Sequence, residues 1–287
     1  QIPSCSENII IPDGTTEIPV QAFLGCTQLE TVTFPTSLEI IGNDAFFNTS
    51  IGEANLSGTN VTDIGERAFY QCANLENVIF PTTLETIGDN AFERSGIKEA
   101  DLSATNVTEI RNFAFYGCAN LETVTFPTSL ETIGEEAFYD SGIAEADLSG
   151  TSVTKIGEGA FFNCNDLKTV TFPKTYFSLD PSAFGGTDIQ EFQFTCEYEM
   201  NNYLHYTNAI CPHITENTKI TAGENIINAF QDCPGVSNSQ ENNIAQECTG
   251  TPPPDNPTTS PTMSPTNNPT TSPTISRPEH PDSTETD

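Results

Sequence analysis

The side chains that carry out most enzyme chemistry form no recognisable constellation in this sequence. Its three histidines are His205, His213 and His280, and the chain has no G-x-S-x-G, H-E-x-x-H or phosphate-loop motif. The 40 acidic residues are so numerous that a carboxylate pair could be drawn almost anywhere, so no pair identifies a general acid and base. We therefore predict that the protein is not an enzyme and needs no cofactor.

The charge balance narrows the classes of partner. The chain has 40 acidic and 9 basic residues, for a net charge of −31. Such a surface repels phosphate backbones, so nucleic acid and anionic membranes are not expected partners. Cations, basic proteins and sugars are compatible with it, although solubility alone also explains the charge. No apolar run approaches the ~20 residues of a membrane span, so we expect no membrane insertion.

Cysteines and glycosylation sequons indicate an oxidising compartment. The chain has nine cysteines, and it starts at Gln1, which fits a mature chain after removal of a signal peptide. We predict that the protein is secreted, extracellular or on the cell surface. The candidate N-glycosylation sites are Asn48, Asn55, Asn60 and Asn106.

The cysteines and the sequon asparagines lie within a repeat, because an Ala-Phe pair recurs at a constant interval of 23 residues. A row of aliphatic residues precedes each pair by four positions, from Ile18 to Leu179. Like residues at a fixed period indicate coils that stack the same side chain on their neighbours. The pairs are Ala22-Phe23, Ala45-Phe46, Ala68-Phe69, Ala91-Phe92, Ala114-Phe115, Ala137-Phe138, Ala160-Phe161 and Ala183-Phe184.

The coils alternate in two types, so the full unit is 46 residues. One type reads C-x-x-L-x-x-V-x-F-P and the other S-G-I-x-E-A-D-L-S, which has one residue fewer before its strand. The alternating apolar residues of each predict a short strand, which in the first type ends at a proline. The I-G-x-x-A-F segment is too short for a full helix, and we expect one helical or 3₁₀ turn there.

The pattern I-G-x-x-A-F-x-x-C-x-x-L-x-x-V-x-F-P resembles the BspA-type leucine-rich repeat over about residues 6–195. The resemblance implies a right-handed solenoid with a parallel sheet on its concave face, used for adhesion and recognition without catalysis. The chain departs from that family in its strict alternation, and at Arg111, where most repeats have glycine. We divide the chain into an N-terminal cap and first half-coil (1–20), the solenoid (21–195), a cysteine-containing cap (196–249) and a tail (250–287).

Four cysteines, Cys26, Cys72, Cys118 and Cys164, recur every 46 residues. They would lie two coils apart, at about 10 Å, which exceeds disulfide reach, so we expect free buried thiols. Hydroxyl residues fill the same place in the alternate coils. Cys5, however, lies about one coil from Cys26, and a Cys5–Cys26 disulfide is a separate hypothesis.

Four more cysteines follow the last clear strand, where a solenoid needs a cap over its exposed end. Four cysteines permit three pairings, and their equal spacing of 15 suggests 196–211 with 233–248. Segment 228–233 repeats the Ala-Phe phase, so one decayed coil is expected inside the cap. The cap cysteines are Cys196, Cys211, Cys233 and Cys248.

The tail has prolines every four residues from Pro257 to Pro273, in a P-T-x-S/N motif. It cannot pack a core, so it should be disordered or extended, either as a plain stalk or as an O-glycosylated rod. We favour glycosylation because hydroxyl residues are dense. The candidate O-glycosylation sites are Thr258, Thr259, Ser260, Thr262, Ser264, Thr266, Thr270, Thr271, Ser272, Thr274 and Ser276.

On the predicted concave sheet, residues on either side of each inward residue should face solvent. They form hydroxyl-rich and acidic stripes on alternate coils. A solvated face that resists aggregation, a ligand or cation surface and an ice-binding threonine array are three interpretations. The intervening carboxylates argue against the third, and Ca²⁺ binding by the second has weak support, because no known calcium motif occurs. The candidate binding residues are Glu53, Glu99, Asp101, Thr123, Thr125, Glu145, Asp147 and Glu191.

Two non-enzymatic functions follow. The first is a structural glycoprotein that forms an extracellular matrix, coat or fibre with itself or other glycoproteins, which the rod, the tail rhythm and the sequons favour. The alternative is a secreted or surface adhesin that binds a protein or glycan on the concave face, which the family resemblance favours.

Overall fold

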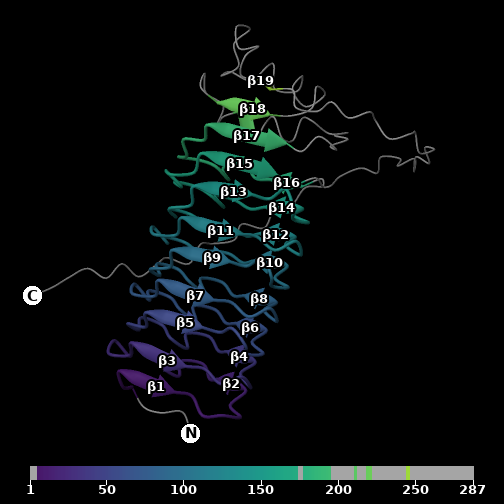
Figure 1. The fold of residues 1–287 in the computed structure, drawn as a ribbon. Helices are drawn as coiled ribbons and strands as arrows, with labels where there is room; N and C mark the ends of the chain where they lie inside the picture. The colour runs from purple at the N-terminus through teal and green to yellow at the C-terminus, as the bar shows by residue number, and fades with distance from the viewer. Residues whose placement is uncertain (1–4, 174–176, 195–209, 212–217, 222–243, 246–287) are drawn as a thin grey trace, which may run out of the picture. The chain divides into compact units, whose positions relative to one another are not determined.

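The computed structural model describes residues 5–173, 177–194, 210–211, 218–221 and 244–245. The chain divides into two units, Gln1–Thr249 and Gly250–Asp287, and every described residue belongs to the first. Within it, successive coils stack into a parallel β-solenoid (Figure 1). The predicted solenoid is therefore confirmed, and its two rows of strands lie on opposite sides of the stack.

The first row consists of one strand per coil. These strands pair in parallel within three separate sheets, and we call the outer surface of the row the long-strand face. In the three-residue strands from β5 to β13 the central residue points inward and its neighbours point outward, because side chains alternate along a strand. These strands are β1 (Asn8–Ile10), β3 (Thr31–Thr33), β5 (Glu53–Asn55), β7 (Asn77–Ile79), β9 (Glu99–Asp101), β11 (Thr123–Thr125), β13 (Glu145–Asp147), β15 (Thr169–Phe172), β17 (Glu191–Phe194), β18 (Lys219–Thr221) and β19 (Ile244–Ala245).

The second row is a continuous eight-stranded parallel sheet of two-residue strands. The sequence revealed its isoleucine row but not that these residues form strands. The register places each buried isoleucine over the next, as Ile110 over Ile133. The strands are β2 (Glu17–Ile18), β4 (Ile40–Ile41), β6 (Asp63–Ile64), β8 (Thr86–Ile87), β10 (Glu109–Ile110), β12 (Thr132–Ile133), β14 (Lys155–Ile156) and β16 (Ser178–Leu179).

A ladder of phenylalanine rings fills the interior between the two sheets. From Phe23 to Phe184, each ring of the Ala-Phe repeat stacks on the next with centroids 5.1–5.6 Å apart. All eight rings are buried. Since one coil cannot enclose its own ring, the ladder explains why the pair recurs at a constant period.

The turns after the second sheet are not helical, so the expectation of a helical or 3₁₀ turn was wrong. From the first turn to the one that ends at Asn163, each contains residues of positive φ four positions apart, such as Asp44 at 55° and Asn48 at 52°. Between them the amides bond three residues back, as Phe47 N–H does to the Asp44 carbonyl. The left-handed residues turn the alternate amides toward the next coil, as with Asp44 N–H to the Glu66 carbonyl at 2.8 Å. A helix cannot form where every second amide bonds outside its own turn.

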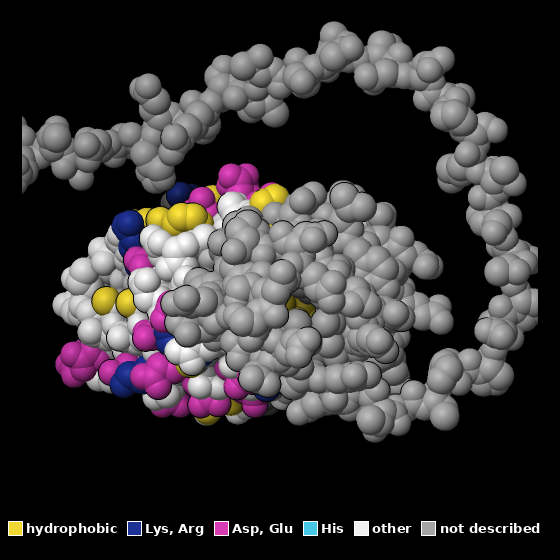
Figure 2. All heavy atoms as spheres, turned by 90° about the horizontal axis from the view of Figure 1, so that it is seen from above, with side chains coloured by type: hydrophobic (Ala, Val, Ile, Leu, Met, Phe, Trp, Pro, Cys, Tyr) yellow, Lys and Arg dark blue, Asp and Glu magenta, His cyan; other side chains and the backbone are white. Residues whose placement is uncertain are grey.

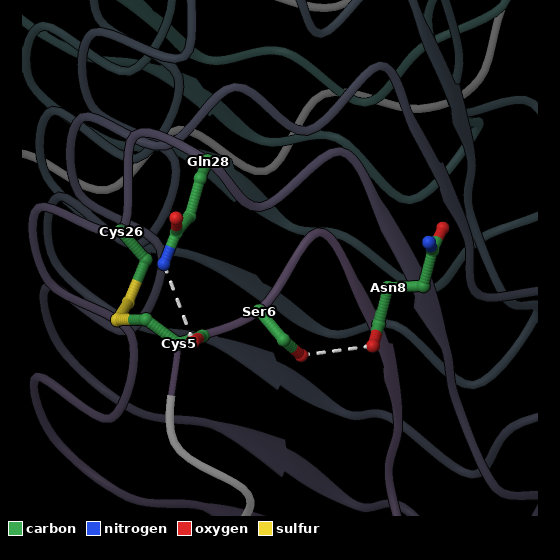
Figure 3. The surroundings of a disulfide bond; sticks show 5 residues. All are labelled: Cys5, Ser6, Asn8, Cys26 and Gln28. Carbon is green, nitrogen blue, oxygen red and sulfur yellow. Dashed lines mark hydrogen bonds between the residues drawn. A yellow bond between two sulfur atoms is a disulfide. The ribbon is translucent and has the colours of Figure 1, made fainter.

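The cysteine row is buried as predicted. Cys5 and Cys26 form a disulfide with Cα atoms 5.6 Å apart, and the Gln28 amide donates to the Cys5 carbonyl at 3.3 Å beside it (Figure 3). Cys72, Cys118 and Cys164 are free and buried.

The thiols alternate with hydroxyls along the row, and each thiol donates to a carbonyl of the preceding coil. For Cys118 these contacts are Ser95 at 3.5 Å and the Phe92 carbonyl at 3.0 Å. This shared network of weak donors and acceptors explains the alternation of cysteine with serine or threonine. Burial raises the pKa of the Cys118 thiol to about 12. At the C-terminal end Cys211 is disulfide-bonded, while Cys196, Cys233 and Cys248 lie outside the described residues.

Candidate ligand-binding face

The long-strand face presents the acidic and hydroxyl stripes that the sequence predicts. Glu99 and Asp101 are exposed on either side of Ala100, which is fully buried, and Glu145 and Asp147 flank Ala146 in the same way. Thr123 and Thr125 are exposed around Val124 on the strand between them. Glu53 is also exposed, whereas Glu191 is half-buried.

The sheet beneath these stripes is interrupted at regular intervals. No ladder joins β3 to β5 or β11 to β13, although all four strands are described, and β7 pairs with β9 only through Asn77 and Glu99. A few bonds ahead of the strands, such as Ala144 N–H to the Glu122 carbonyl at 3.2 Å, still hold the coils together. We call these three places the open junctions. They recur at 46-residue intervals, each where an S-G-I coil follows a C-x-x-L coil.

The next junction of the same kind, between β15 and β17, is fully paired from Thr169–Glu191 to Phe172–Phe194. Here β17 carries Phe192 at the inward position that is alanine in β5, β9 and β13. Phe192 lies 5.9 Å from both Phe172 and Phe184, ring centre to ring centre. An alanine side chain is too small to make these ring contacts. Alanine is the inward residue of β5, β9 and β13, the strands that follow the open junctions.

The strands at the open junctions also end in a tight turn. The Asp101 and Asp147 carboxylates each accept the backbone N–H two residues on at 3.0 Å, from Ser103 and Ser149. Such Asx turns divert the chain from an extended path. In β17 the residue at this position is Gln193, which accepts instead from the Thr171 hydroxyl of the neighbouring strand at 3.3 Å.

Each of two open junctions forms a groove with an apolar floor and an acidic rim. The groove between β11 and β13 has a volume of about 510 Å³, and that between β7 and β9 about 380 Å³. Their floors include Val124, 7% exposed, and Val78, 8% exposed, whereas Val170 at the closed junction is fully buried. The rims include Thr123, Thr125, Glu145 and Asp147 in the first groove, and Asn77, Ile79, Glu99 and Asp101 in the second.

The rim carboxylates carry charge that is not locally balanced. Among the described residues, no lysine or arginine forms an ion pair with Glu53, Glu99 or Glu145. The basic side chains are few and several lie beside acidic ones (dark blue and magenta in Figure 2). The charge of the face is balanced at β17, where the Glu191 carboxylate forms an ion pair with Lys219 of β18 at 2.8 Å. The described residues contain no group of three or more histidine, cysteine or acidic side chains arranged to hold a metal ion.

The sequon asparagines lie on two sides of the solenoid, and all four are exposed. Asn55 is on the long-strand face, where its Oδ1 accepts the Ser57 hydroxyl at 2.7 Å. Asn60 and Asn106 occupy equivalent positions, and each amide nitrogen donates to a carbonyl of the preceding coil at 3.0 and 3.1 Å. Asn48 is a left-handed turn residue. The histidines and the proposed O-glycosylation sites lie outside the described residues.

Sequence reasoning missed the grooves and a second aromatic row. The sequence does mark the position of the grooves, because each S-G-I coil has one residue fewer before its strand. We did not predict that strand pairing would be lost there. The second row lies outside the phenylalanine ladder, where Phe47 stacks on Tyr70 at 4.8 Å and Tyr116 stacks on Tyr139 at 4.7 Å. Partial burial is the main cause that raises the pKa of Tyr70, and it is also the main cause that raises the pKa of Tyr116.

A family model and one solved structure agree with this architecture. A family model described as a BspA type leucine rich repeat region matches residues 4–106 and 100–211. A solved leucine-rich repeat protein from Bacteroides ovatus is 24% identical with a TM-score of 0.50, covering 78% of this chain and 64% of that one. A leucine rich cell surface protein from Faecalibacterium prausnitzii is 20% identical with a TM-score of 0.38, covering 66% and 60%. The Pneumococcal vaccine antigen PcpA is 17% identical with a TM-score of 0.37, covering 83% and 77%.

The chain spans less than two thirds of the first two solved chains. The similarity to the Bacteroides ovatus protein concerns the fold alone. Among curated proteins, none matches the chain significantly. In the part of the chain that the structure describes, no helix has the length and apolarity to cross a membrane.

Proposed function

The chain belongs to the family of BspA-type leucine-rich-repeat proteins, and from that premise we propose that it is a secreted or cell-surface recognition protein without catalytic activity, which binds a partner on its long-strand face. The observation that carries the proposal is the pair of grooves at successive open junctions, each with an apolar floor and polar rim. Binding sites usually combine these two features, because apolar contact supplies affinity and a few polar groups supply specificity.

Stability of the solenoid alone does not explain the open junctions. A sheet that served only as a scaffold would gain stability from continuous pairing, as β15 and β17 show by burying Val170 and Phe172 fully. The open junctions forgo those backbone bonds and leave apolar surface partly exposed to water, which is unfavourable in the absence of a ligand. The proposal explains why the arrangement nevertheless recurs.

Retention on arrays of glycans and extracellular proteins tests this function. The unmodified protein should be retained by some component. Glu99→Lys with Glu145→Lys should abolish retention, because each substitution removes two units of negative charge from one groove rim. The matched control is Glu135→Lys with Glu158→Lys, which changes the net charge equally at exposed residues away from the long-strand face. Loss of retention in both pairs would indicate a general charge effect and refute a site on the long-strand face.

A second candidate is a subunit of an extracellular matrix, coat or fibre, with itself or other glycoproteins as partners. The tetrapeptide rhythm of the tail and the four sequons favour it. So does β1, which pairs with β3 on one edge only among the described strands and carries Ile10 at 73% exposure, since an open edge can pair with another chain. Electron microscopy of the native material should then show ordered filaments, whereas dispersed monomers would refute this role.

A further inference from the structure

We propose that the open junctions bind a basic segment of a partner protein in the polyproline II conformation, with lysine or arginine at every third residue. This inference rests on the proposed recognition function and specifies its partner. The grooves, an internal ion pair and the spacing of the coils support it.

The groove chemistry suits a long cationic side chain. Lysine and arginine have an aliphatic stem and a charged head, so they bind best where an apolar floor adjoins a carboxylate. In the larger groove Val124 and Phe126 offer that floor, with 7% and 8% of their surface exposed, and the Glu145 carboxylate lies at the rim. In the smaller groove Val78 and Phe80 take the same places beside Glu99. An anionic ligand would be repelled by the same rims.

The solenoid itself contains an example of this pairing. Lys219 lies opposite Glu191 in the β17–β18 register, and its ammonium group is 2.8 Å from the carboxylate. Glu191 is the repeat equivalent of Glu53, Glu99 and Glu145. A lysine one coil away can therefore reach the acidic stripe across the face of the sheet. At the same position beside Glu99 and Glu145, the following strands supply Thr123 and Thr169 instead. These carboxylates are therefore left for a cation from another molecule.

The spacing of the acidic stripe selects the conformation of the ligand. Successive glutamates are two coils apart. The second sheet is paired throughout and sets the distance between coils, so two coils span about 9.6 Å at the usual separation of paired strands. A polyproline II segment advances ~3.1 Å per residue and has three residues per turn, so every third side chain lies on one side at intervals of about 9.3 Å. Lysines at that spacing would meet Glu53, Glu99 and Glu145 in register. A β-strand does not match, because its same-face residues repeat at about 6.8 Å.

The experiment uses the full-length protein and two fluorescent peptides of identical composition. One is (Lys-Pro-Pro)₄, and the other places four lysines together before eight prolines. Fluorescence anisotropy should show tighter binding of the first, with an affinity that falls as salt rises. Replacing Glu99 and Glu145 with glutamine should weaken binding of (Lys-Pro-Pro)₄ about tenfold, as expected for two partly exposed ion pairs. Glu135→Gln with Glu158→Gln should leave it unchanged.

The outcomes separate this inference from the function on which it rests. Equal affinity for the two peptides, or an equal loss in both glutamine pairs, would show unspecific attraction to an acidic protein and overturn the inference. If neither peptide binds while the Glu99→Lys, Glu145→Lys pair still loses array retention, the recognition function stands and the basic segment is wrong. Retention on a glycan that (Lys-Pro-Pro)₄ does not displace would likewise overturn it. Circular dichroism verifies that each variant is folded.

Discussion

Removal of one ring from the middle of the phenylalanine ladder should destabilise the solenoid more than removal of its first ring. Phe115 is fully buried and stacks at 5.3 Å on both Phe92 and Phe138. Phe23 is 1% exposed and, among the described rings, stacks only on Phe46, at 5.2 Å. The two side chains therefore differ chiefly in the number of stacking partners.

The magnitudes follow from that difference. Truncation of a buried phenylalanine to alanine costs about 3–5 kcal/mol, through lost burial and the cavity that remains. Each stacked aromatic pair contributes about 0.5–1.5 kcal/mol beyond burial. We therefore expect Phe115→Ala to lower the free energy of unfolding by about 4–5 kcal/mol, and Phe23→Ala by about 1 kcal/mol less.

Urea denaturation followed by far-ultraviolet circular dichroism measures both values. The midpoint and the slope must be fitted together, since the coils of a solenoid can unfold in stages and a changed slope would reveal this. Phe115→Leu serves as a control that keeps most of the apolar volume and loses the stacking. Equal losses for Phe115→Ala and Phe23→Ala would refute an energetic role for stacking along the row.

The remaining predictions concern the disulfide, the thiols and two glycines. Reduction of Cys5–Cys26, which closes a loop of sequence separation 21, should cost about 3 kcal/mol in the same urea assay, and Cys5→Ser should reproduce that loss without reductant. Iodoacetamide followed by mass mapping should leave Cys72 and Cys164 unmodified in the native protein at pH 8, because burial raises the pKa of each thiol from 9.0 to about 11. Since the folded state holds these protons more tightly, the thiols contribute stability that is complete below pH 9.0 and should be lost as pH rises through about 11. Gly142→Ala should lower the thermal midpoint, because a Cβ there would lie 2.5 Å from the Ala119 carbonyl oxygen, whereas Gly150→Ala, with no atom within 4 Å, should not.

The sequence predicted the features that depend on identical residues stacking at a fixed interval. The phenylalanine ladder, the buried isoleucine row and the free thiols of Cys72, Cys118 and Cys164 all follow from the rule that each coil repeats the environment of the last. The Cys5–Cys26 disulfide followed from the same phase, because it depends only on two residues lying about one coil apart.

Features that depend on the bonding between coils were not predictable in the same way. The left-handed turn positions are occupied by residues as different as Gln21, Arg67 and Gly159, so no single residue type marks them. They redirect amides to the next coil and so exclude the helical turn that the short apolar pattern favoured. The grooves lie where two neighbouring strands fail to pair. The inward residue there is alanine, such as Ala146, whereas Phe192 occupies that position at the paired junction.

The open junctions also make the solenoid unequally stiff along its length. The second sheet is continuous from β2 to β16, whereas the long-strand sheet loses its ladder at β3–β5 and β11–β13 and nearly so at β7–β9. A force that bends the stack away from the long-strand face would separate coils first where backbone bonds are fewest. The solenoid should therefore bend at the open junctions, with the continuous second sheet as the hinge and the paired coils between the junctions moving as rigid units.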